Sequence, residues 1–151
     1  MIGFIQAAEG VVPESWIDVN GHMNIMWYTQ IFDRGCEAVL KRLGITEDSI
    51  KLGGITVVAA RILTIHRREM LLGDKWHLWS ALLTATPLTL TFSHRLVVAG
   101  GVKAVCHIQS QAFDLVSRSQ AKLSHAILSK AERLLVSGVI DPFIVREGYG
   151  S

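Results

Sequence analysis

The chain has few cysteines and prolines, and it lacks a long uninterrupted hydrophobic run. Two of its 151 residues are cysteine and three are proline. Cys36 and Cys106 lie in apolar segments without the spacing of metal ligands, which predicts free thiols in a reducing compartment. The most apolar stretch, 78–98, is interrupted by Pro87 and several threonines, so it falls short of the roughly 20 apolar residues that cross a membrane. Because residues 1–5 also lack the basic start of a signal peptide, we expect a cytoplasmic protein with no membrane partner.

No charge of one sign dominates the sequence. The formal net charge is +2, which predicts no nucleic-acid partner, since such proteins usually carry a strongly basic patch. Charged residues make up 19% of the chain and hydrophobic residues 50%. Without a membrane-spanning run, this apolar excess indicates that part of the surface is covered by another copy of the chain, as in a homodimer or homotetramer.

Hydrophobic periodicity predicts one long helix among several strands. Apolar residues from Asn24 to Leu43 recur on one helical face and Gly44 stands where a helix commonly ends, so we expect this helix to be mostly buried. A final helix is predicted over 119–137, followed by an irregular tail. Strands separated by turn signals such as Gly100-Gly101 are predicted at 2–17, 55–66, 76–85, 88–98 and 102–116. This order predicts an α+β fold in which an antiparallel meander packs on the helix.

A polar loop separates the first predicted strand from the long helix. Within seven residues it contains a carboxylate, two carboxamides, a glycine and an imidazole, namely Asp18, Asn20, Asn24, Gly21 and His22. Packing alone does not explain polar groups this dense between an apolar strand and an apolar helix. At a helix start, backbone N–H groups can hold a developing negative charge beside a carboxylate. This layout is typical of an acyl-transfer site.

The loop and helix resemble the hotdog-fold acyl-CoA thioesterases of the 4-hydroxybenzoyl-CoA thioesterase-like superfamily. Their pattern D-x-x-G-H-x-N-x-x-x-Y stands here as residues 18–28, and 31–34 and 43–45 are also similar. The resemblance covers about residues 10–118. It implies a hotdog fold, an antiparallel sheet wrapped around a long central helix, with an additional C-terminal helix. The expected division is a hotdog thioesterase-like domain at 1–118, with 119–151 as a C-terminal helix and tail of the same domain.

The resemblance implies that the chain hydrolyses an acyl-CoA thioester to a carboxylic acid and free CoA. Asp18 matches the family's catalytic carboxylate, which acts as nucleophile or as base for water. Backbone N–H groups near Gly21, His22 and Asn24 match those that polarise the thioester carbonyl. No separate cofactor is expected, since coenzyme A is part of the substrate. In this family the active site forms between protomers, so residues of a second copy are expected to complete it.

Three groups of side chains are candidates for these roles. The expected catalytic residues are Asp18, His22 and Asn24, with His22 supporting the loop by hydrogen bonding and Asn24 also capping the helix. The candidates for binding the substrate are Asn20, Gly21, Trp27, Tyr28, His66 and Glu69. The candidates for binding CoA, because guanidinium groups suit phosphates, are Arg67, Arg68, Arg95 and Arg118. No metal site is expected, because the six histidines do not stand at metal-ligand spacing.

Other interpretations of these residues stay open. Core packing for the aromatic residues and ordinary surface charge for the arginines are the simpler alternatives, and Glu37 is a second carboxylate on the predicted helix. A hotdog enoyl-CoA hydratase or dehydratase uses the pattern D-x-N-x-x-H, and here the histidine of Asp18-x-Asn20-x-His22 comes one residue early. A non-catalytic acyl-CoA-binding module would keep the fold without the reaction. The acyl group is not readable, because pocket walls come from dispersed residues.

Overall fold

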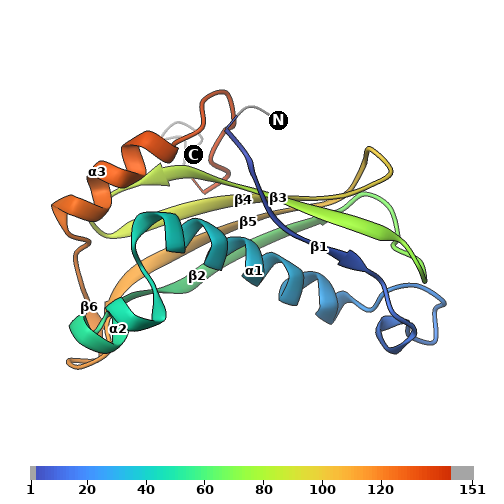
Figure 1. Ribbon diagram of the computed structural model, residues 1–151, viewed down its shortest axis with the longest axis horizontal. Coiled ribbons are helices and arrows are strands. Elements are labelled where there is room, and N and C mark those ends of the chain that lie inside the picture. Colours follow the sequence, from blue (N-terminus) through green and yellow to red (C-terminus); the bar gives the residue numbers. More distant parts are fainter. Residues whose placement is uncertain (1–2, 144–151) are drawn as a thin grey trace, which may run out of the picture.

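The computed structural model describes residues 3–143, which form a curled antiparallel sheet with a long helix packed on one face (Figure 1). The strand order is β1-β3-β4-β5-β2, and β6 pairs with β5. The strands are β1 Ile5–Val11, β2 Ile55–His66, β3 Lys75–Ala85, β4 Thr89–Val98, β5 Gly101–Asp114 and β6 Ser119–Gln120. The helices are α1 Ile25–Leu43, α2 Glu47–Gly53 and α3 His125–Leu134. The long helix followed by an antiparallel meander confirms the predicted α+β fold.

The long helix α1 begins and ends where the sequence predicts. Asn24 is the N-cap, because its Oδ1 accepts the Met26 N–H at 3.0 Å, and Gly44 ends the helix with a left-handed φ of 83°. Phe32 and its neighbours on one side of α1 are buried in the core. The expectation that α1 is mostly buried is wrong: Ile25 and Met26 are 67% and 59% exposed, because the sheet covers only one side. Within residues 3–143, neither α1 nor any other helix has the length and apolarity needed to cross a membrane.

The first predicted strand is shorter in the structure. β1 ends at Val11 rather than continuing to residue 17, since Pro13 precedes a short 3-10 turn at Glu14–Trp16. Residues 1–2 of the prediction lie outside the described residues.

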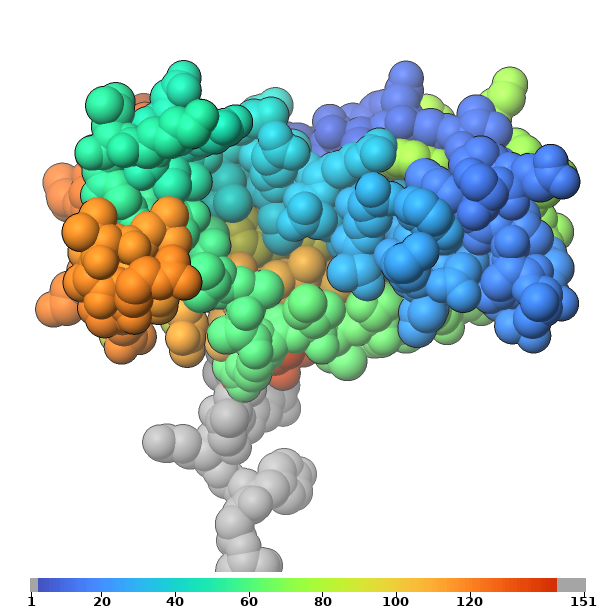
Figure 2. Space-filling model, turned by 90° about the horizontal axis from the view of Figure 1, so that it is seen from below, coloured from blue at the N-terminus to red at the C-terminus, as the bar shows by residue number. Residues whose placement is uncertain are grey.

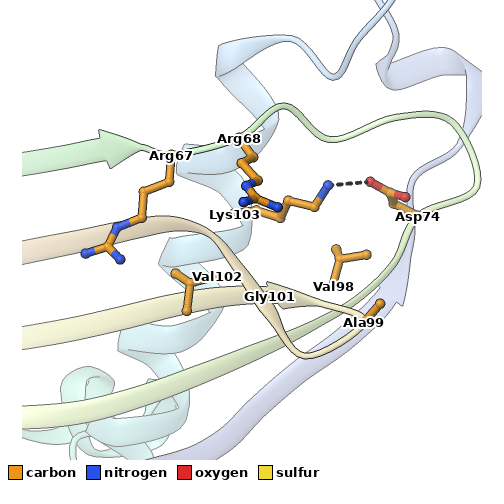
Figure 3. Close-up of a pocket in the computed structure, with 8 residues that line it drawn as sticks. All are labelled: Arg67, Arg68, Asp74, Val98, Ala99, Gly101, Val102 and Lys103. Carbon is orange, nitrogen blue, oxygen red and sulfur yellow. Dashed lines mark ion pairs between the residues drawn. The ribbon is translucent and has the colours of Figure 1, made fainter.

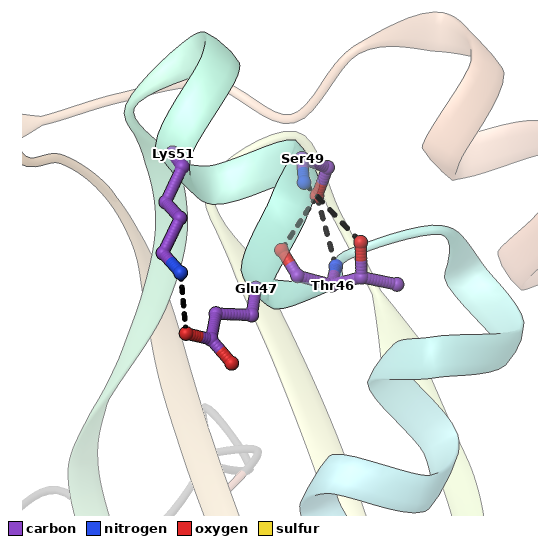
Figure 4. Close-up of polar contacts among 4 residues, drawn as sticks. All are labelled: Thr46, Glu47, Ser49 and Lys51. Carbon is purple, nitrogen blue, oxygen red and sulfur yellow. Dashed lines mark hydrogen bonds and ion pairs between the residues drawn. The ribbon is translucent and has the colours of Figure 1, made fainter.

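The short helix α2 is missing from the predicted elements. A capping box starts it, in which the Ser49 N–H donates to Thr46 Oγ1 at 3.2 Å and the Thr46 N–H to Ser49 Oγ at 2.8 Å (Figure 4). One turn apart, the Lys51 ammonium pairs with the Glu47 carboxylate at 2.6 Å. Because α2 has only seven residues, it is too short to show an apolar helical repeat in the sequence.

The C-terminal helix is also shorter than the predicted 119–137. Its first two residues instead form β6, and the N-cap Ser124 starts α3 at His125. After α3 the chain runs beside β3, where the Val136 N–H donates to the Leu82 carbonyl at 3.0 Å. Ala131 of α3 is buried in the same core as α1. The predicted tail beyond residue 143 lies outside the described residues.

The β4–β5 hairpin turns one residue earlier than predicted. Val98 pairs with Gly101, so the two turn residues are Ala99 and Gly100. Their φ values of 48° and 79° are both positive, as a two-residue type I′ turn requires. The sequence signal from the glycine pair thus locates the hairpin, but the strand register places an alanine in the first turn position.

A buried imidazole lies between α1 and the sheet. His94 of β4 has no exposed surface and stacks against Phe32 and Phe92, with ring centroids 5.9 and 6.3 Å away. His94 Nδ1 is 2.8 Å from Ser80 Oγ, and its Nε2 is 3.4 Å from Cys36 Sγ. Burial lowers the pKa of His94 to about 3, so the imidazole is neutral at physiological pH.

Close packing of α1 on the sheet depends on Gly35. A Cβ at this position would collide with Ser80 Oγ and with the His94 ring.

Both cysteines carry free thiols, Cys36 partly exposed and Cys106 buried. Burial raises the pKa of Cys106 to about 11, and it also raises the pKa of Cys36, so both are protonated thiols at neutral pH.

Candidate active site

The polar loop before α1 is a tight turn that is fixed by backbone hydrogen bonds. The Gly21 N–H donates to the Asp18 carbonyl at 3.0 Å, and the Asp18 N–H donates to the His22 carbonyl at 3.1 Å. Gly21 has a φ of 77°, a conformation that favours glycine. The Met23 N–H then donates to the Met70 carbonyl at 2.8 Å, which ties the loop to the β2–β3 connection. The backbone therefore holds the loop in one conformation beside α1.

Two donors hold the Asp18 carboxylate. Its Oδ1 accepts the Asn20 backbone N–H at 2.8 Å, and its Oδ2 accepts the Asn24 side-chain amide at 2.9 Å. The hydrogen bond from the Asn20 backbone, and next the one from Asn24, lower the pKa of Asp18 below its ordinary value. The carboxylate is therefore ionised at neutral pH, which is the form that a general base or a nucleophile needs.

Asn24 connects Asp18 to the start of α1. Its amide donates to Asp18 while its Oδ1 accepts the Met26 N–H, so one side chain holds both the carboxylate and the helix end. Two of the three backbone N–H groups predicted to polarise the thioester carbonyl, those of Gly21 and Asn24, already donate to backbone carbonyls of the protein. The first helical N–H belongs instead to Ile25, in the turn where helical N–H groups lack a carbonyl four residues back. The positive end of α1 thus lies beside Asp18.

An apolar pocket of about 300 Å³ lies beside this loop. It brings together five predicted site residues from two distant segments of the sequence, namely His22, Tyr28, His66, Arg68 and Glu69. The Tyr28 ring meets His66 edge-on, with centroids 4.5 Å apart. Sequence reasoning missed the rest of the wall, which Met23 and Ile25 supply. His22 contacts the loop backbone, with its Nδ1 3.2 Å from the Met23 carbonyl oxygen.

Trp27 lies in an aromatic stack and is absent from the wall of this pocket. Its ring stacks on Trp16 at 4.9 Å and 11°, and Trp16 in turn stacks on Trp76 of β3 at 6.5 Å. The predicted role in substrate binding therefore has no support from its position, and packing between α1 and β3 explains the residue. The spacing of aromatic residues in the sequence could not show which of them share a stack.

A larger basic pocket of about 650 Å³ adjoins the apolar one (Figure 3). Arg67 and Arg68, both predicted to bind CoA, enter it from the end of β2, and Lys103 enters it from β5. Lys103 Nζ lies 3.5 Å from the Asp74 carboxylate and donates to the Glu69 carbonyl at 3.0 Å. Because Arg68 lines both pockets, the apolar and basic cavities meet at this side chain.

The remaining predicted residues lie away from the loop. Arg95 follows the core residue His94 on β4, so it is on the opposite face of the sheet from α1, over the Phe4 ring at 4.6 Å. Arg118 lies near the start of β2, over the Phe113 ring at 5.4 Å. Glu37 forms an exposed ion pair with Lys41 at 2.8 Å. In residues 3–143, no three His, Cys, Asp or Glu side chains converge in a way that could hold a metal ion.

Solved structures of low sequence identity share this fold. The Staphylococcus aureus protein SAV2348, solved in complex with CoA, is 14% identical, with a TM-score of 0.80 over 88% of this chain and 87% of its own. The probable thioesterase YbaW from Escherichia coli is 20% identical, with a TM-score of 0.72 over 87% and 100%. Slr0204, a 1,4-dihydroxy-2-naphthoyl-CoA thioesterase from Synechocystis, is 14% identical, with a TM-score of 0.71 over 82% and 93%. These matches confirm the hotdog fold.

The family is shown by the sequence. A comparison with curated proteins finds no match. The model of the thioesterase-like superfamily, in contrast, matches residues 12–131, which include the polar loop, α1 and strands β2 to β6. The chain therefore belongs to the thioesterase-like superfamily, and its enzyme class is that of the thioester hydrolases.

Proposed function

We propose that this protein hydrolyses acyl-CoA thioesters, with Asp18 as base or nucleophile and the N-terminus of α1 polarising the carbonyl. The observation that carries the proposal is the ionised Asp18 carboxylate, held by Asn20 and Asn24 beside the helix start and an apolar pocket. CoA as the carrier is supported by SAV2348, which was solved with CoA, and by Slr0204, which is a CoA thioesterase. CoA belongs to the substrate, so the reaction needs no separate cofactor.

The pockets suggest how the substrate binds. The acyl group enters the apolar pocket beside Tyr28 and His66, and the thioester carbonyl oxygen lies at the Ile25 N–H. As a tetrahedral intermediate forms, its negative oxygen is stabilised by this N–H and by the positive end of α1, and one such donor lowers the barrier by about 3 kcal/mol.

Asp18 can then act in either of two ways. As a base it takes a proton from water, whose oxygen attacks the carbonyl carbon; the C–S bond breaks, and the CoA thiolate leaves and is protonated. As a nucleophile it attacks the carbonyl carbon itself and expels the thiolate, forming a mixed anhydride that water then hydrolyses. Both routes end in a carboxylic acid, free CoA and a regenerated Asp18.

The basic pocket is the proposed site for the CoA phosphates. Replacing Arg68 with glutamine should raise KM for an acyl-CoA by about fivefold with little change in kcat, because a charge-assisted hydrogen bond is lost in both ground and transition states. Steady-state kinetics with an acyl-pantetheine, which lacks the nucleotide phosphates, should show a much smaller difference between the variant and the wild type, because only the contact of Arg68 with the apolar pocket then remains. Arg133→Gln, an exposed arginine on α3, is the matched control. An unchanged KM for acyl-CoA would contradict the assignment.

The edge strand β2 is the proposed contact between two copies of the chain. It stands at the end of the sheet order, and its exposed apolar residues include Ile62 at 53% and Ile65 at 46%. Figure 2 shows a hollow between α1 and β2, and a cavity of about 140 Å³ lined partly by Asp33 and Ile62 lies there. Antiparallel pairing of two β2 strands would remove the open edge. It would also bring Arg118 of the second copy toward the Arg67–Arg68 end of the first.

Replacing Ile62 with aspartate should weaken this dimer by about 100-fold, since burying an unpaired carboxylate costs about 3 kcal/mol. Light scattering across a dilution series measures the change. Leu52→Asp, at an exposed leucine of α2, is the control and should leave the dimer intact. A wild-type chain that is monomeric at all concentrations, or an unaffected I62D dimer, would contradict the β2 interface.

We also place the protein in a reducing compartment such as the cytoplasm. Both cysteines are free, and the Cys36 thiol lies 3.4 Å from His94 Nε2. Free thiols that take part in packing are typical of reducing compartments.

The hydratase alternative is separated from hydrolysis by following two signals with crotonyl-CoA. Hydrolysis releases free thiol as the thioester is consumed, whereas hydration removes the enoyl absorbance and leaves the thiol concentration unchanged. We expect the thiol to appear, and butyryl-CoA, which has no double bond to hydrate, should react in the same way. Loss of enoyl absorbance without thiol release would replace the proposed reaction by hydration.

A further inference from the structure

We propose that the outer face of the sheet carries a second binding site, for a small organic anion with an aliphatic body. The site is a cavity of about 330 Å³, close to the lower end of the size range of small-molecule pockets. It is lined by Arg67, Ser93, Arg95, Val102, Val105, His107, Val139 and Ile140. The inference does not depend on the proposed reaction.

The cavity lies on the side of the sheet that faces away from α1. Side chains alternate along a strand, and His94 and Cys106 point into the core, so Ser93 and His107 point outward from adjacent strands. These two residues stand directly opposite each other in the β4–β5 register, as do Arg95 and Val105. Their four side chains therefore form one continuous floor.

The segment that follows α3 forms the roof. It is fixed to the sheet because Thr84 Oγ1 donates to Asp141 Oδ2 at 2.8 Å and Arg61 donates to the Phe143 carbonyl at 3.3 Å. Between Val136, which is bonded to β3, and this anchor, Val139 and Ile140 lie over the cavity. The roof is thus held at both of its ends.

Two buried polar atoms at this cavity lack partners. Ser93 is only 1% exposed, and its Oγ makes no hydrogen bond within the described residues. His107 Nδ1, on the facing strand, is buried and without a partner in the same range. Buried polar atoms are nearly always paired, so two orphans that line one cavity point to a bound group that pairs with them.

The charges and the apolar wall define the class of ligand. Neither Arg67 nor Arg95 forms an ion pair with any residue from 3 to 143. The nearby carboxylate of Asp141 already accepts hydrogen bonds from Thr84 and from the Phe143 N–H. Two guanidinium groups and a free hydroxyl suit a carboxylate or phosphate head group. The aliphatic side chains of Val102, Val105, Val139 and Ile140 suit a short hydrocarbon body.

Calorimetric titration of the full-length protein with octanoate, octyl phosphate and acetate tests the site. We expect saturable binding of octanoate or octyl phosphate, at least about tenfold tighter than that of acetate, because the apolar wall buries the chain. Arg95→Gln should weaken this binding at least about tenfold and Ser93→Ala about threefold, with Arg95→Lys giving partial recovery. Arg133→Gln on α3 should have no effect.

The controls separate this site from the other pockets. Asp18→Asn should leave octanoate binding unchanged, since Asp18 lies in the loop before α1 and is not among the residues that line this cavity. CoA is not a neutral control, because Arg67 and Val102 line both this cavity and the basic pocket. Val105→Trp, which fills the cavity, should abolish binding in a protein whose circular dichroism is that of the wild type. The proposal is overturned if neither octyl ligand binds, if acetate binds as tightly, or if the Arg95 and Ser93 variants bind like the wild type.

Discussion

Replacing Asp18 with asparagine is expected to lower kcat for acyl-CoA hydrolysis by about 10³-fold, with little change in KM. The carboxylate is the group that attacks or activates water, and an amide can do neither at neutral pH. The backbone of the loop does not depend on this charge, because its turn is closed by the Gly21 and Asp18 N–H groups. Kinetics of free-thiol release under saturating substrate measure the loss.

The asparagine variant has one structural cost that a second variant controls. The NH₂ group of the new asparagine would point at the NH₂ group of Asn24. The Asn24 amide cannot flip to offer its oxygen instead, because that Oδ1 accepts the Met26 N–H and caps α1. Asp18→Ala removes that conflict and should lose as much activity. Asp48→Asn, on the exposed first turn of α2, is the matched control and should retain full activity. If either Asp18 variant keeps activity within tenfold of the wild type, another group performs the chemistry.

Acid should destabilise the fold through His94. The pKa of this imidazole is about 3 in the folded chain against an ordinary value of 6.5, because burial between Phe32 and Phe92 excludes the charged form. Above pH 6.5 neither the folded nor the unfolded state binds this proton. Between pH 6.5 and 3 only the unfolded state does, so the free energy of unfolding falls by about 1.4 kcal/mol per pH unit, or about 2 kcal/mol at pH 5.

Urea unfolding of the wild type and of His94→Phe at pH 7.5 and pH 5.0 measures this effect. The phenylalanine keeps the ring packing and removes the titrating group, so its free energy of unfolding should change by about 2 kcal/mol less between the two pH values. The substitution also costs stability at both pH values, because Ser80 Oγ and Cys36 Sγ lose their contacts with His94. This cost cancels when only the change in free energy of unfolding between the two pH values is compared. Equal pH dependence in both proteins would show that His94 is not the group responsible.

Local signals in the sequence predict the parts of the fold that depend on neighbours along the chain. Asn24 and Gly44 define α1 because a cap needs only its own turn. The start of α3 is harder to predict, since its apolar repeat begins only at Leu123 and the preceding residues 119–120 are taken into a strand pair with β5. Ala99 shows the same limit, because the register of two long strands decides which residues turn.

In the candidate site, too, a local pattern predicts some residues, whereas only the tertiary fold brings the others together. Asp18 and Asn24 are found from the loop alone, because their hydrogen bond spans only six residues. The pocket that joins His22 to His66 is formed by the sheet bringing the end of β2 to the start of α1, which no local pattern encodes. Conversely, Trp27 and Arg95 have suitable chemistry for the site but lie in a stack and on the outer face.

The most direct test of the central claim is a free-thiol release assay with the wild-type protein against a panel of acyl-CoAs. The panel contains acetyl, medium-chain, benzoyl, hydroxybenzoyl and betainyl esters, which differ in how they would fill the apolar pocket beside Tyr28 and His66. Catalytic release of CoA thiol from at least one ester, with an equal amount of free acid, is the predicted result. A folded protein that binds these esters and releases thiol from none of them would contradict hydrolysis and favour a binding module.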